Sequence, residues 1–404
     1  MGDLVSGTTV LVAGASIAGP ALAHWLRRRG AAVTVVERAP GIRPGGQAVD
    51  ARGVAKEAIR RMGLDEAVRA ACTDTAGANT VDADGNVLET YRADDDGGDG
   101  YIAEIEILRG DMSQVLYDDT RDGVEYLFDD RIAELTQDAD GVDVTFASGK
   151  RRRFDLVVGA DGLHSSLRET VFGPRAQFIR HLGLVLAFYS VPNEFDLDRW
   201  MVEYQERESG RSAGLRPIQD ATRAMAIFSF PAGEFDVDYR DIEGQKRLLR
   251  EQMAGLGWLT PRILAHLDDT PDFYLDQVAQ VVMDRWYDGR VGLIGDAAFS
   301  ASPMSGQGTG LALVGAYVLA GELAAAGWDP EAGFAAYQER MRPMVEASQE
   351  IGRMHVESLA AAEPDAEPRP EPDMEAFMAL VDRALNGVDL PDYDGVPDSG
   401  PSKP

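Results

Sequence analysis

Short apolar runs and amphipathic segments alternate at the start of the chain. Residues 8–13 form an apolar run that ends at Gly14 and predicts a buried parallel strand. From Ala18 to Gly30 apolar side chains recur at helical spacing, and the arginines near the end suit the dipole of a helix. Residues 32–36 predict a second buried strand. Strand, helix and strand in this order predict a βαβ unit.

The buried-strand pattern returns twice, and a different pattern separates the two returns. Phe154–Gly159 and residues 291–295 are apolar runs, and the second precedes a long apolar helix predicted over Gly308–Ala326. Between residues 175 and 285 apolar and polar positions alternate, which predicts a mostly antiparallel sheet. The alternating runs are Leu184–Val191, Met201–Gln205 and Arg223–Phe230. Further predicted elements are helices at 53–72, 111–120 and Met374–Leu385 and a strand at 142–147.

The chain therefore enters one domain, leaves it and returns. We expect an α/β protein in which a Rossmann-type domain with a parallel sheet is interleaved with a mostly antiparallel-sheet substrate domain, followed by C-terminal helices. The expected ranges are 1–74, 102–174 and 286–350 for the Rossmann-type domain, 75–101 and 175–285 for the substrate domain, and 351–404 for a C-terminal helix and tail. A Pro/Glu/Asp-rich linker at 363–373 precedes that helix, and Val388–Pro404 is predicted to be disordered.

Composition narrows the class of protein. The chain has 404 residues, of which 45% are hydrophobic, so it can bury a large core, and a net charge of −29 argues against nucleic acid and anionic membranes as partners. One cysteine, Cys72, and five histidines without ligand spacing predict neither a disulfide nor a metal site. No run reaches the roughly 18 to 20 apolar residues of a membrane span, and the N-terminus leaves no room for a signal peptide. We expect a cytoplasmic protein, monomeric or homodimeric.

The loop between the first strand and helix carries a glycine pattern, Gly14-Ala-Ser16-Ile17-Ala18-Gly19. In the dinucleotide-binding pattern G-x-G-x-x-G, the first glycine permits a tight turn and the last lets helix and strand pack closely; here Ser16 replaces the second. The N–H groups of the helix N-terminus favour a pyrophosphate, and Glu37 after the second strand can accept hydrogen bonds from ribose hydroxyls. The context favours dinucleotide binding over a plain structural turn and leaves NAD and FAD as alternatives.

Two further motifs resemble those of one flavoprotein family. The segment from Asp155 to Arg168 contains Asp161-Gly162 and resembles the "DG" motif of single-component flavoprotein aromatic hydroxylases. Gly295-Asp296-Ala-Ala resembles their "GD" motif. Other matching positions are Glu37, Arg38, Arg109, Pro303, Gly306, Gln307 and Gly308. The chain thus resembles FAD-dependent monooxygenases of the para-hydroxybenzoate hydroxylase type, nearest to those that tailor or inactivate polyketide-type antibiotics, including tetracycline-modifying ones.

The resemblance implies FAD as the cofactor and assigns a set of contacts to it. Asp296 would accept hydrogen bonds from the ribityl hydroxyls, and the helix N-terminus near Thr309 would stabilise negative charge on the reduced flavin. Asp161 and Gly162 would touch both FAD and the nicotinamide cofactor. The residues implied to bind the cofactor are Gly14, Ser16, Ile17, Ala18, Gly19, Glu37, Arg38, Arg43, Gln47, Arg109, Asp161, Gly162, Asp296, Pro303, Gly306, Gln307, Gly308, Thr309 and Gly310. Two positions depart from the family: Phe299, where many relatives have histidine, and Gly310, where many have asparagine.

The activity implied by the resemblance is oxygenation of a small aromatic or polyketide-like substrate. NADPH or NADH, bound transiently, reduces FAD, and O2 adds at the flavin C4a atom to give a hydroperoxide that hydroxylates the substrate or performs a Baeyer–Villiger oxidation. The flavin carries this chemistry, so no catalytic side chain is predicted. Candidate substrate contacts, for which ordinary core packing is the alternative, are Phe188, Met201, Tyr204, Met225, Phe228 and Phe230.

Other functions on the same fold stay open at this point. A flavin reductase or oxidase would use the same FAD motifs, and Phe299 and Gly310 make a non-catalytic protein that binds FAD and a ligand conceivable. A flavin halogenase is disfavoured, because Trp258 and Trp286 lie in no W-x-W-x-I-P context. Consumption of O2 and NAD(P)H, stimulated by substrate, separates a monooxygenase from these alternatives.

Overall fold

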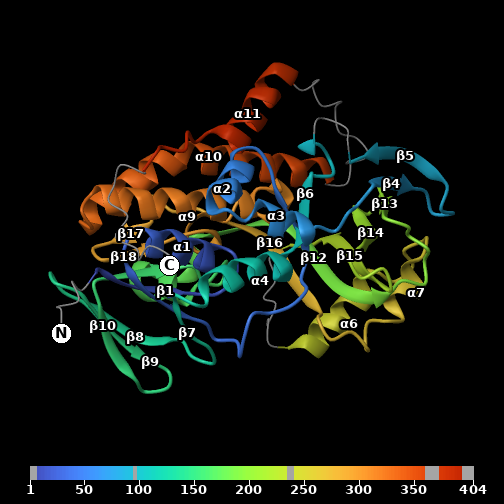
Figure 1. Ribbon diagram of the computed structural model, residues 1–404. Coiled ribbons are helices and arrows are strands. Elements are labelled where there is room, and N and C mark those ends of the chain that lie inside the picture. The colour runs from blue at the N-terminus through green and yellow to red at the C-terminus, as the bar shows by residue number, and fades with distance from the viewer. Residues whose placement is uncertain (1–6, 94–97, 234–240, 360–372, 394–404) are drawn as a thin grey trace.

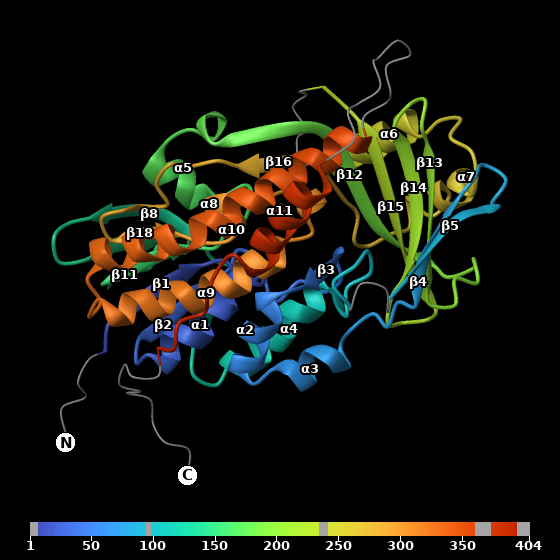
Figure 2. The same ribbon diagram turned by 90° about the horizontal axis from the view of Figure 1, so that it is seen from above.

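The computed structural model describes residues 7–93, 98–233, 241–359 and 373–393 of the chain. Two large sheets lie side by side, with the long helices α9 (Gly308–Ala325) and α10 (Pro330–Leu359) running above the first (Figure 1). Helix α10 continues towards strand β12 (Ile179–Pro192) of the second sheet (Figure 2). Its last residue, Leu359, packs with Leu184 and Leu186 of that strand, so α10 joins the two halves.

A six-stranded sheet with the order β17-β18-β11-β1-β2-β7 forms the first half. Strand β1 pairs in parallel with β2 and β11, and β11 pairs in parallel with β18. The strands span Thr9–Ala13 (β1), Ala32–Val36 (β2), Glu125–Leu127 (β7), Leu156–Gly159 (β11), Tyr287–Asp288 (β17) and Val291–Leu293 (β18). Val10, Leu11 and Val12 are fully buried, as expected for a parallel strand covered on both faces.

Helices cover one face of this sheet and a small antiparallel sheet covers the other. Helix α1 (Ala18–Arg28), α9 and α10 lie above the sheet in Figure 1, and strands β8, β9 and β10 lie below it. These three strands span Ile132–Gln137, Val142–Phe146 and Arg151–Phe154. Connecting loops lie at the carboxyl-terminal ends of the parallel strands.

Helix α9 is long and apolar enough to cross a membrane, whereas the sequence analysis expected no such segment. Of this helix, 89% is buried inside the protein, where it packs against α1, α10 and α2 (Val54–Met62). A helix that is apolar all round can serve as the centre of a large core, and that is its position here.

A seven-stranded sheet with the order β16-β12-β15-β14-β13-β4-β5 forms the second half. Its pairs are antiparallel except that between β13 and β4. Helices α6 (Ile242–Gln252) and α7 (Thr260–Leu264) pack on one face. The strands other than β12 span Gly77–Val81 (β4), Val87–Arg92 (β5), Trp200–Glu206 (β13), Arg211–Pro217 (β14), Arg223–Pro231 (β15) and Tyr274–Val281 (β16).

Shorter elements connect the two sheets. Strands β3 (Ala48–Ala51) and β6 (Ile105–Leu108) form an antiparallel pair that leads into helix α4 (Arg109–Thr120). The remaining helices are α3 (Asp65–Ala70), α5 (Ser166–Phe172), α8 (Asp296–Phe299) and α11 (Met374–Asn386), with 3-10 turns η2 (Arg175–Gln177) and η3 (Pro303–Ser305).

The structure confirms the α/β class, with a parallel sheet, a mostly antiparallel sheet and C-terminal helices. The helix predicted at 53–72 is two helices, because Gly63 ends α2 in the left-handed conformation with a φ of 77°. The apolar run from Phe154 is also divided. Phe154 ends β10, and the Asp155 carboxylate accepts the main-chain N–H of Thr9 at 2.7 Å before β11 begins.

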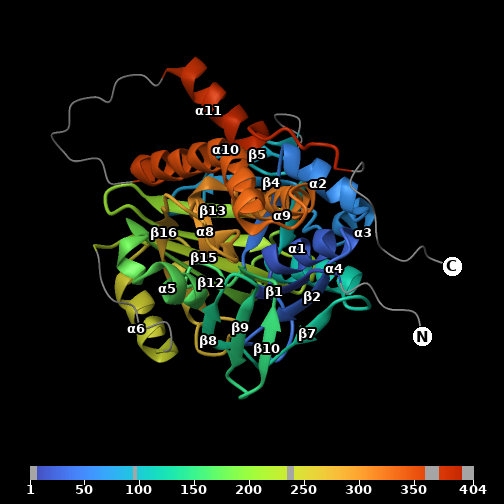
Figure 3. The same ribbon diagram turned by 90° about the vertical axis from the view of Figure 1, so that its left-hand side faces the viewer.

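The last described residues pack onto the body of the protein. Val388 and Tyr393 are buried in the main core, although disorder was expected from Val388 onward. The Tyr393 hydroxyl donates to Glu322 Oε1 at 2.6 Å. Helix α10 crosses residue 350, where a domain boundary was expected, and α11 packs against it (Figure 3). Residues 394–404 and nearly all of the predicted linker lie outside the described residues.

Candidate active site

Four strand ends meet at one edge of the six-stranded sheet. Strands β18, β11, β1 and β2 are parallel neighbours, so the loops that follow them leave the sheet at the same edge. These loops carry Asp296, Asp161, Gly14 and Glu37. Motifs that are far apart in the sequence therefore line one cavity.

Backbone contacts explain the glycines of the first loop. Gly14 has a φ of 110°, and a Cβ atom there would lie 2.4 Å from the Ala160 carbonyl oxygen. A Cβ atom on Gly19 would lie 1.9 Å from the carbonyl oxygen of Gly14. Gly14, Ile17 and Ala18 line the cavity, whereas Gly19 does not. Gly19 therefore acts from outside the cavity, by allowing α1 to pack closely against the loop.

Arg109 occupies the space beside Ser16, the residue that replaces the second glycine. Its Nη1 donates to Ser16 Oγ at 3.0 Å, and its main-chain N–H donates to the Gln47 carbonyl at 3.0 Å. Burial, and then the nearby Arg43, lower the pKa of the Arg109 guanidinium below its ordinary value. No carboxylate in the described part of the chain lies within ion-pair distance of it. This partly buried cation is therefore suited to an anionic group such as a pyrophosphate.

Glu37 is oriented by the main chain at the end of β2. Its Oε2 accepts the N–H of Ala15 at 2.9 Å, and its Oε1 accepts the N–H of Ala39 at 2.9 Å. Each carboxylate oxygen has a further lone pair, so hydroxyl groups can still donate to Glu37 from the cavity. Arg38, Arg43 and Gln47 also line the cavity.

Asp161 organises the start of α5. Its Oδ2 accepts the N–H groups of Ser166 at 2.9 Å and Leu167 at 3.2 Å, while Oδ1 accepts the Ser165 hydroxyl. Gly162, with a φ of 82°, makes the turn between the strand and the helix. Both Asp161 and Gly162 line the cavity, so the turn has a structural role and also faces the site.

Asp296 and the start of α9 form a further wall. The Asp296 side chain is exposed to the cavity. Burial raises the pKa of its carboxyl group above the ordinary value, against the effect of the Ser300 hydroxyl and of Arg109. The neighbouring Pro303, Gly306, Gly308 and Thr309 line the same cavity, whereas Gln307 and Gly310 do not.

The face of the seven-stranded sheet opposite α6 and α7 lines the other side of the cavity. Side chains alternate along a strand, so even-numbered residues of β12 and β14 share this face with odd-numbered residues of β13 and β15. Phe188, Met201 and Met225, three of the predicted substrate contacts, line the cavity together with Leu186 and Ile227. Strands β12, β13 and β15 thus contribute apolar side chains to this wall.

Tyr204, Phe228 and Phe230 were expected on the same wall, but they lie on the opposite face of the sheet. All three pack in the core beneath α6 and α7, and Phe228 is fully buried there. Phe228 is three positions from Met225, so a strand with a period of two directs the two side chains to opposite faces. The sequence analysis chose residues from both faces.

An ion pair that was not predicted lies within this wall, where Arg216 of β14 is in register with Met225 of β15. Arg216 Nη1 donates to Glu106 Oε2 at 2.6 Å, and Thr73 and Thr75 donate to Glu106 Oε1 at 2.6 and 2.7 Å. Arg216 Nε is buried without a hydrogen-bond partner among the described residues. That atom is shielded from solvent, so this donor stays unsatisfied within the sheet face. An arginine at a cavity-facing position of an apolar alternating strand is the sequence signal that was overlooked.

Two more polar pairs were also missed. The Tyr101 hydroxyl donates to Glu203 Oε2 at 3.1 Å, and burial raises the pKa of Glu203 although that hydrogen bond lowers it. His164 Nε2 lies 2.5 Å from Asp276 Oδ2, and the Tyr274 hydroxyl donates to the same oxygen at 3.2 Å. Burial opposes ionisation of Asp276, but these contacts, chiefly that of His164, hold its pKa below the ordinary value. Tyr101, Glu203, His164 and Tyr274 line the cavity.

The cavity that these walls enclose has a volume of about 1770 Å³. A pocket for one drug-sized molecule has a volume of roughly 300–1,000 Å³, so this cavity has room for a cofactor and a second molecule. The residues present fit FAD. The glycine turn admits a close pyrophosphate, Arg109 offers a cation to it, and Glu37 and Asp296 offer carboxylate oxygens to hydroxyl groups.

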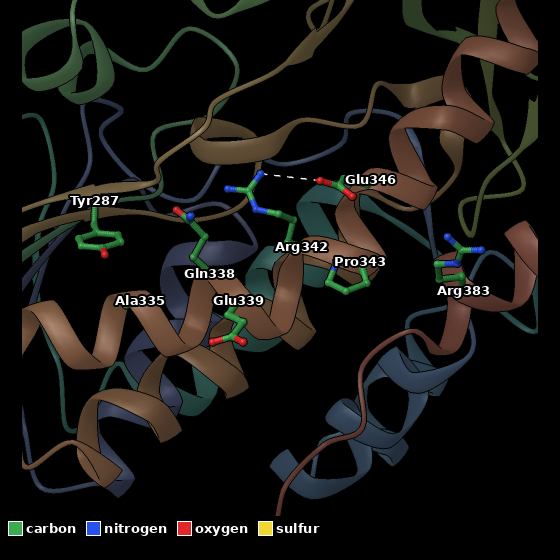
Figure 4. Close-up of a pocket in the computed structure, with 8 residues that line it drawn as sticks. All are labelled: Tyr287, Ala335, Gln338, Glu339, Arg342, Pro343, Glu346 and Arg383. Carbon is green, nitrogen blue, oxygen red and sulfur yellow. Dashed lines mark ion pairs between the residues drawn. The ribbon is translucent and has the colours of Figure 1, made fainter.

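A second hollow, of about 440 Å³, lies between α10, α11 and β17 (Figure 4). Its lining residues are Tyr287, Ala335, Gln338, Glu339, Arg342, Pro343, Glu346 and Arg383. Arg342 lies 3.9 Å from Glu346 and donates to the Asp284 carbonyl at 2.6 Å, so its charge is already engaged. None of the motif residues reaches this hollow, and the larger cavity is the candidate active site.

Comparison with known proteins decides the family. The family described as FAD binding domain matches residues 7–350 of the chain. A flavin-dependent monooxygenase from an unknown prokaryotic organism is 39% identical over 384 residues, covering 95% of this chain and 98% of the relative. The chain belongs to the flavin-dependent monooxygenases. It is accordingly an FAD-binding oxidoreductase, as the three motifs predicted.

Two other relatives are similar over nearly the whole length. An uncharacterised protein of Mycobacterium tuberculosis (strain H37Rv) is 44% identical over 386 residues, covering 95% of this chain and all of its own. The crystal structure of the tetracycline destructase Tet(55) superposes with a TM-score of 0.84 at 37% identity, covering 97% of this chain and 100% of that one. These similarities confirm the resemblance to tetracycline-modifying flavoproteins.

Proposed function

We propose that this flavin-dependent monooxygenase uses NADPH or NADH and O2 to insert one oxygen atom into a small aromatic or polyketide-like substrate. The observation that carries the proposal is the single cavity, which is lined on one side by the strand-end loops and on the other by the apolar sheet face. A cofactor held by the loops and a substrate held on the sheet would share one enclosed space. Exclusion of water from that space protects reactive oxygen chemistry.

The protein's own contribution would be binding and orientation. Arg109 would hold the pyrophosphate, Glu37 would accept from the adenosine ribose, and Asp296 would accept from the ribityl chain. The N-terminus of α9, where Thr309 lies, would point towards the flavin. Phe188, Met201 and Met225 would contact the substrate. The remaining motif residues that line the cavity, Gly14, Ser16, Ile17, Ala18, Arg38, Arg43, Gln47, Asp161, Gly162, Pro303, Gly306 and Gly308, would complete the cofactor site.

The proposed reaction consumes one NAD(P)H for each oxygen atom that is inserted. Bound FAD would supply electron transfer from NAD(P)H and activation of O2. One oxygen atom enters the substrate as a hydroxyl group or beside a ketone, the other leaves as water, and NAD(P)H and a proton are consumed. The name of the similar tetracycline destructase makes tetracycline the first substrate to test.

The test uses the purified FAD-loaded protein and follows NADPH and NADH oxidation, O2 uptake and hydrogen peroxide in parallel, with tetracycline and with simple phenols. We expect substrate to accelerate cofactor oxidation and label from isotopic O2 to appear in the product. Hydrogen peroxide equal to the NAD(P)H consumed, with no labelled product, would instead indicate an oxidase. No oxidation of NAD(P)H with any ligand would indicate a binding protein.

A further inference from the structure

Few contacts hold the Arg109 side chain in the cofactor half of the cavity. Its Nη1 donates to Ser16 Oγ at 3.0 Å, and among the residues that the structure describes this is the one hydrogen bond of the guanidinium. Burial, and then the charge of Arg43, lower the pKa of the guanidinium below the ordinary value. Arginine has five N–H donors, so four of them remain for an anion in the cavity.

The loop before β3 leaves room for this guanidinium at a residue without a side chain. A Cβ atom on Gly46 would lie 2.9 Å from Arg109 Nε and 3.1 Å from Arg109 Nη2. Gly46 also has a φ of 87°, which glycine adopts without strain. The guanidinium therefore lies between the main chain of Gly46 and the hydroxyl of Ser16, and it bridges the two loops that carry them.

The main chain of α4 is held in place without the help of Ser16. The N–H of Arg109 donates to the Gln47 carbonyl at 3.0 Å. Farther along the helix, Asp119 Oδ2 lies 2.6 Å from Nδ1 of His24 in α1. Loss of the Ser16 hydroxyl would therefore release the Arg109 side chain and leave the helix in position.

Ser16 stands where the dinucleotide-binding pattern has its second glycine, and two explanations of this departure predict opposite results. If serine is only small enough to be tolerated, glycine in its place would bind the cofactor at least as well. If the hydroxyl positions Arg109, glycine would bind the cofactor less well. The reason is that Arg43 repels the released guanidinium and the long side chain regains conformational freedom.

We propose that Ser16 is a positioning residue, whose hydroxyl holds the Arg109 guanidinium where it meets the pyrophosphate of FAD. The inference rests on the proposed function only in placing the pyrophosphate beside Arg109, and it does not depend on the oxygenation reaction. It goes further in giving a task to the one side chain that departs from the glycine pattern, a task performed through a residue 93 positions away.

The experiment measures FAD binding to the full chain after removal of FAD, by quenching of flavin fluorescence, with neither NAD(P)H nor substrate. Ser16→Ala removes only the hydroxyl, and Ser16→Gly restores the glycine of the pattern. Arg109→Met and the double variant with Ser16→Ala complete a double-mutant cycle. Ser190→Ala is the matched control, because it removes a cavity-lining hydroxyl that donates to Asp272 at 2.5 Å and not to Arg109. Melting temperatures show whether each variant folds.

We expect Ser190→Ala to bind FAD as the wild type does, and Ser16→Ala and Ser16→Gly to bind it about tenfold more weakly. In the Arg109→Met background, Ser16→Ala should change the affinity by less than about twofold, because a positioning residue has no effect once the group that it positions is gone. The comparison of Ser16→Gly with the wild type is decisive even if Arg109→Met does not fold.

Equal or tighter FAD binding by Ser16→Gly would overturn the proposal, and so would losses that add up in the double variant. If Arg109→Met binds FAD as tightly as the wild type, the pyrophosphate does not lie beside Arg109, and the proposed placement of the cofactor fails together with this inference. If the cycle behaves as expected while no oxygenated product ever forms, the proposed function fails and the role of Ser16 stands.

Discussion

Three carboxyl groups in the cavity, those of Asp50, Glu203 and Asp296, have pKa values raised by burial. A carboxyl group kept protonated can donate a hydrogen bond to a carbonyl or phenolic oxygen, which an ionised one cannot do. Glu203 and Asp296 stand on opposite walls, one on the sheet and one at a strand end. At the scale of the residue, burial thus shifts the pKa of carboxyl groups on both walls of the cavity in the same direction.

Glu203→Gln should remove a pH-dependent loss of stability. A raised carboxyl pKa means that the folded state binds the proton more tightly than the unfolded state does. The resulting stabilisation is complete below the unfolded pKa of about 4.3 and is lost as the pH rises through the folded pKa. In thermal melts from pH 4 to 8, the melting temperature of the variant should therefore rise above that of the wild type as the pH increases, and the two should be equal at the acid end.

Glu206→Gln, on the same strand, is the control with the opposite sign. Hydrogen bonds from Ser209 and Arg211 lower the pKa of Glu206, so its contribution is present at neutral pH and is lost on acidification. This variant should be less stable than the wild type at neutral pH and should approach it at the acid end. If both variants differed from the wild type in melting temperature in the same way at every pH, the raised pKa assigned to Glu203 would be contradicted.

Gly19→Ala should damage the cofactor site without a polar change. The new methyl group would lie 1.9 Å from the Gly14 carbonyl, so the loop or α1 must move, at a cost of roughly 1–3 kcal/mol for overpacking. FAD affinity, measured by fluorescence on reconstitution, should fall about tenfold or more. Gly315→Ala in α9 is the matched control: its Cβ atom would lie 3.7 Å from the nearest atom and outside the cavity, so FAD affinity should hardly change. Equal effects at both positions would argue against the role given to Gly19.

Strand β15 shows how one element divides its residues between two tasks. Met225 and Ile227 line the cavity, whereas Phe228 and Phe230 pack under α6 and α7. Strand β12 divides in the same way, with Phe188 in the cavity and Tyr189 stacked on Phe228 at a centroid distance of 5.8 Å. At the scale of the element, aromatic residues that look alike in the sequence differ in function because the strand places them on different faces.

A pair of truncations tests this division. Phe228→Ala should lower the free energy of unfolding by about 3–5 kcal/mol, as for other fully buried phenylalanines, and should leave ligand affinity nearly unchanged in the folded protein. Phe188→Ala should cost much less stability and should weaken substrate binding. Denaturant unfolding and ligand titration measure the two effects. Weakened binding in Phe228→Ala at full folding would show that the faces are assigned wrongly.

The C-terminal segment closes the molecule around its central helix. Tyr393 packs on Gly321 of α9, where a Cβ atom would lie 2.2 Å from the tyrosine ring. The Tyr393 carbonyl accepts a hydrogen bond from Arg29 Nη1 at 2.8 Å. The Tyr317 hydroxyl donates to the Pro391 carbonyl at 2.5 Å. At the scale of the whole molecule, the end of the described chain is therefore part of the core of the FAD-binding half, far in sequence from the β1 strand.

Tyr393→Ala should destabilise the whole protein. Loss of a buried aromatic ring from the main core costs about 3–5 kcal/mol, and FAD retention at elevated temperature should fall with it. Tyr393→Phe removes only the hydroxyl that donates to Glu322, whose Oε1 keeps the Arg340 Nε donor at 2.8 Å, and should cost about 1 kcal/mol. Calorimetry of the two variants measures the difference. A melting temperature unchanged in Tyr393→Ala would show that the segment does not belong to the core.

Local patterns were enough to predict the βαβ unit, the FAD motifs and the change from parallel to antiparallel sheet. Each of these can be recognised from residues close together in the chain, such as Gly14 and Gly19 in one loop. The resemblance of the ordered motifs to those of one flavoprotein family predicted the cofactor, and the strand-end loops of the parallel sheet bring these motifs to one edge.

Tertiary packing settled the substrate side of the cavity. Alternation in β15 separates two sets of residues, but which set faces the cavity depends on where α6 and α7 pack, and no local pattern contains that information. The pairs Arg216–Glu106 and His164–Asp276 join residues more than 100 positions apart. These polar groups are tolerated in the cavity wall because the fold brings each one to its partner, whereas in the sequence they are isolated polar residues.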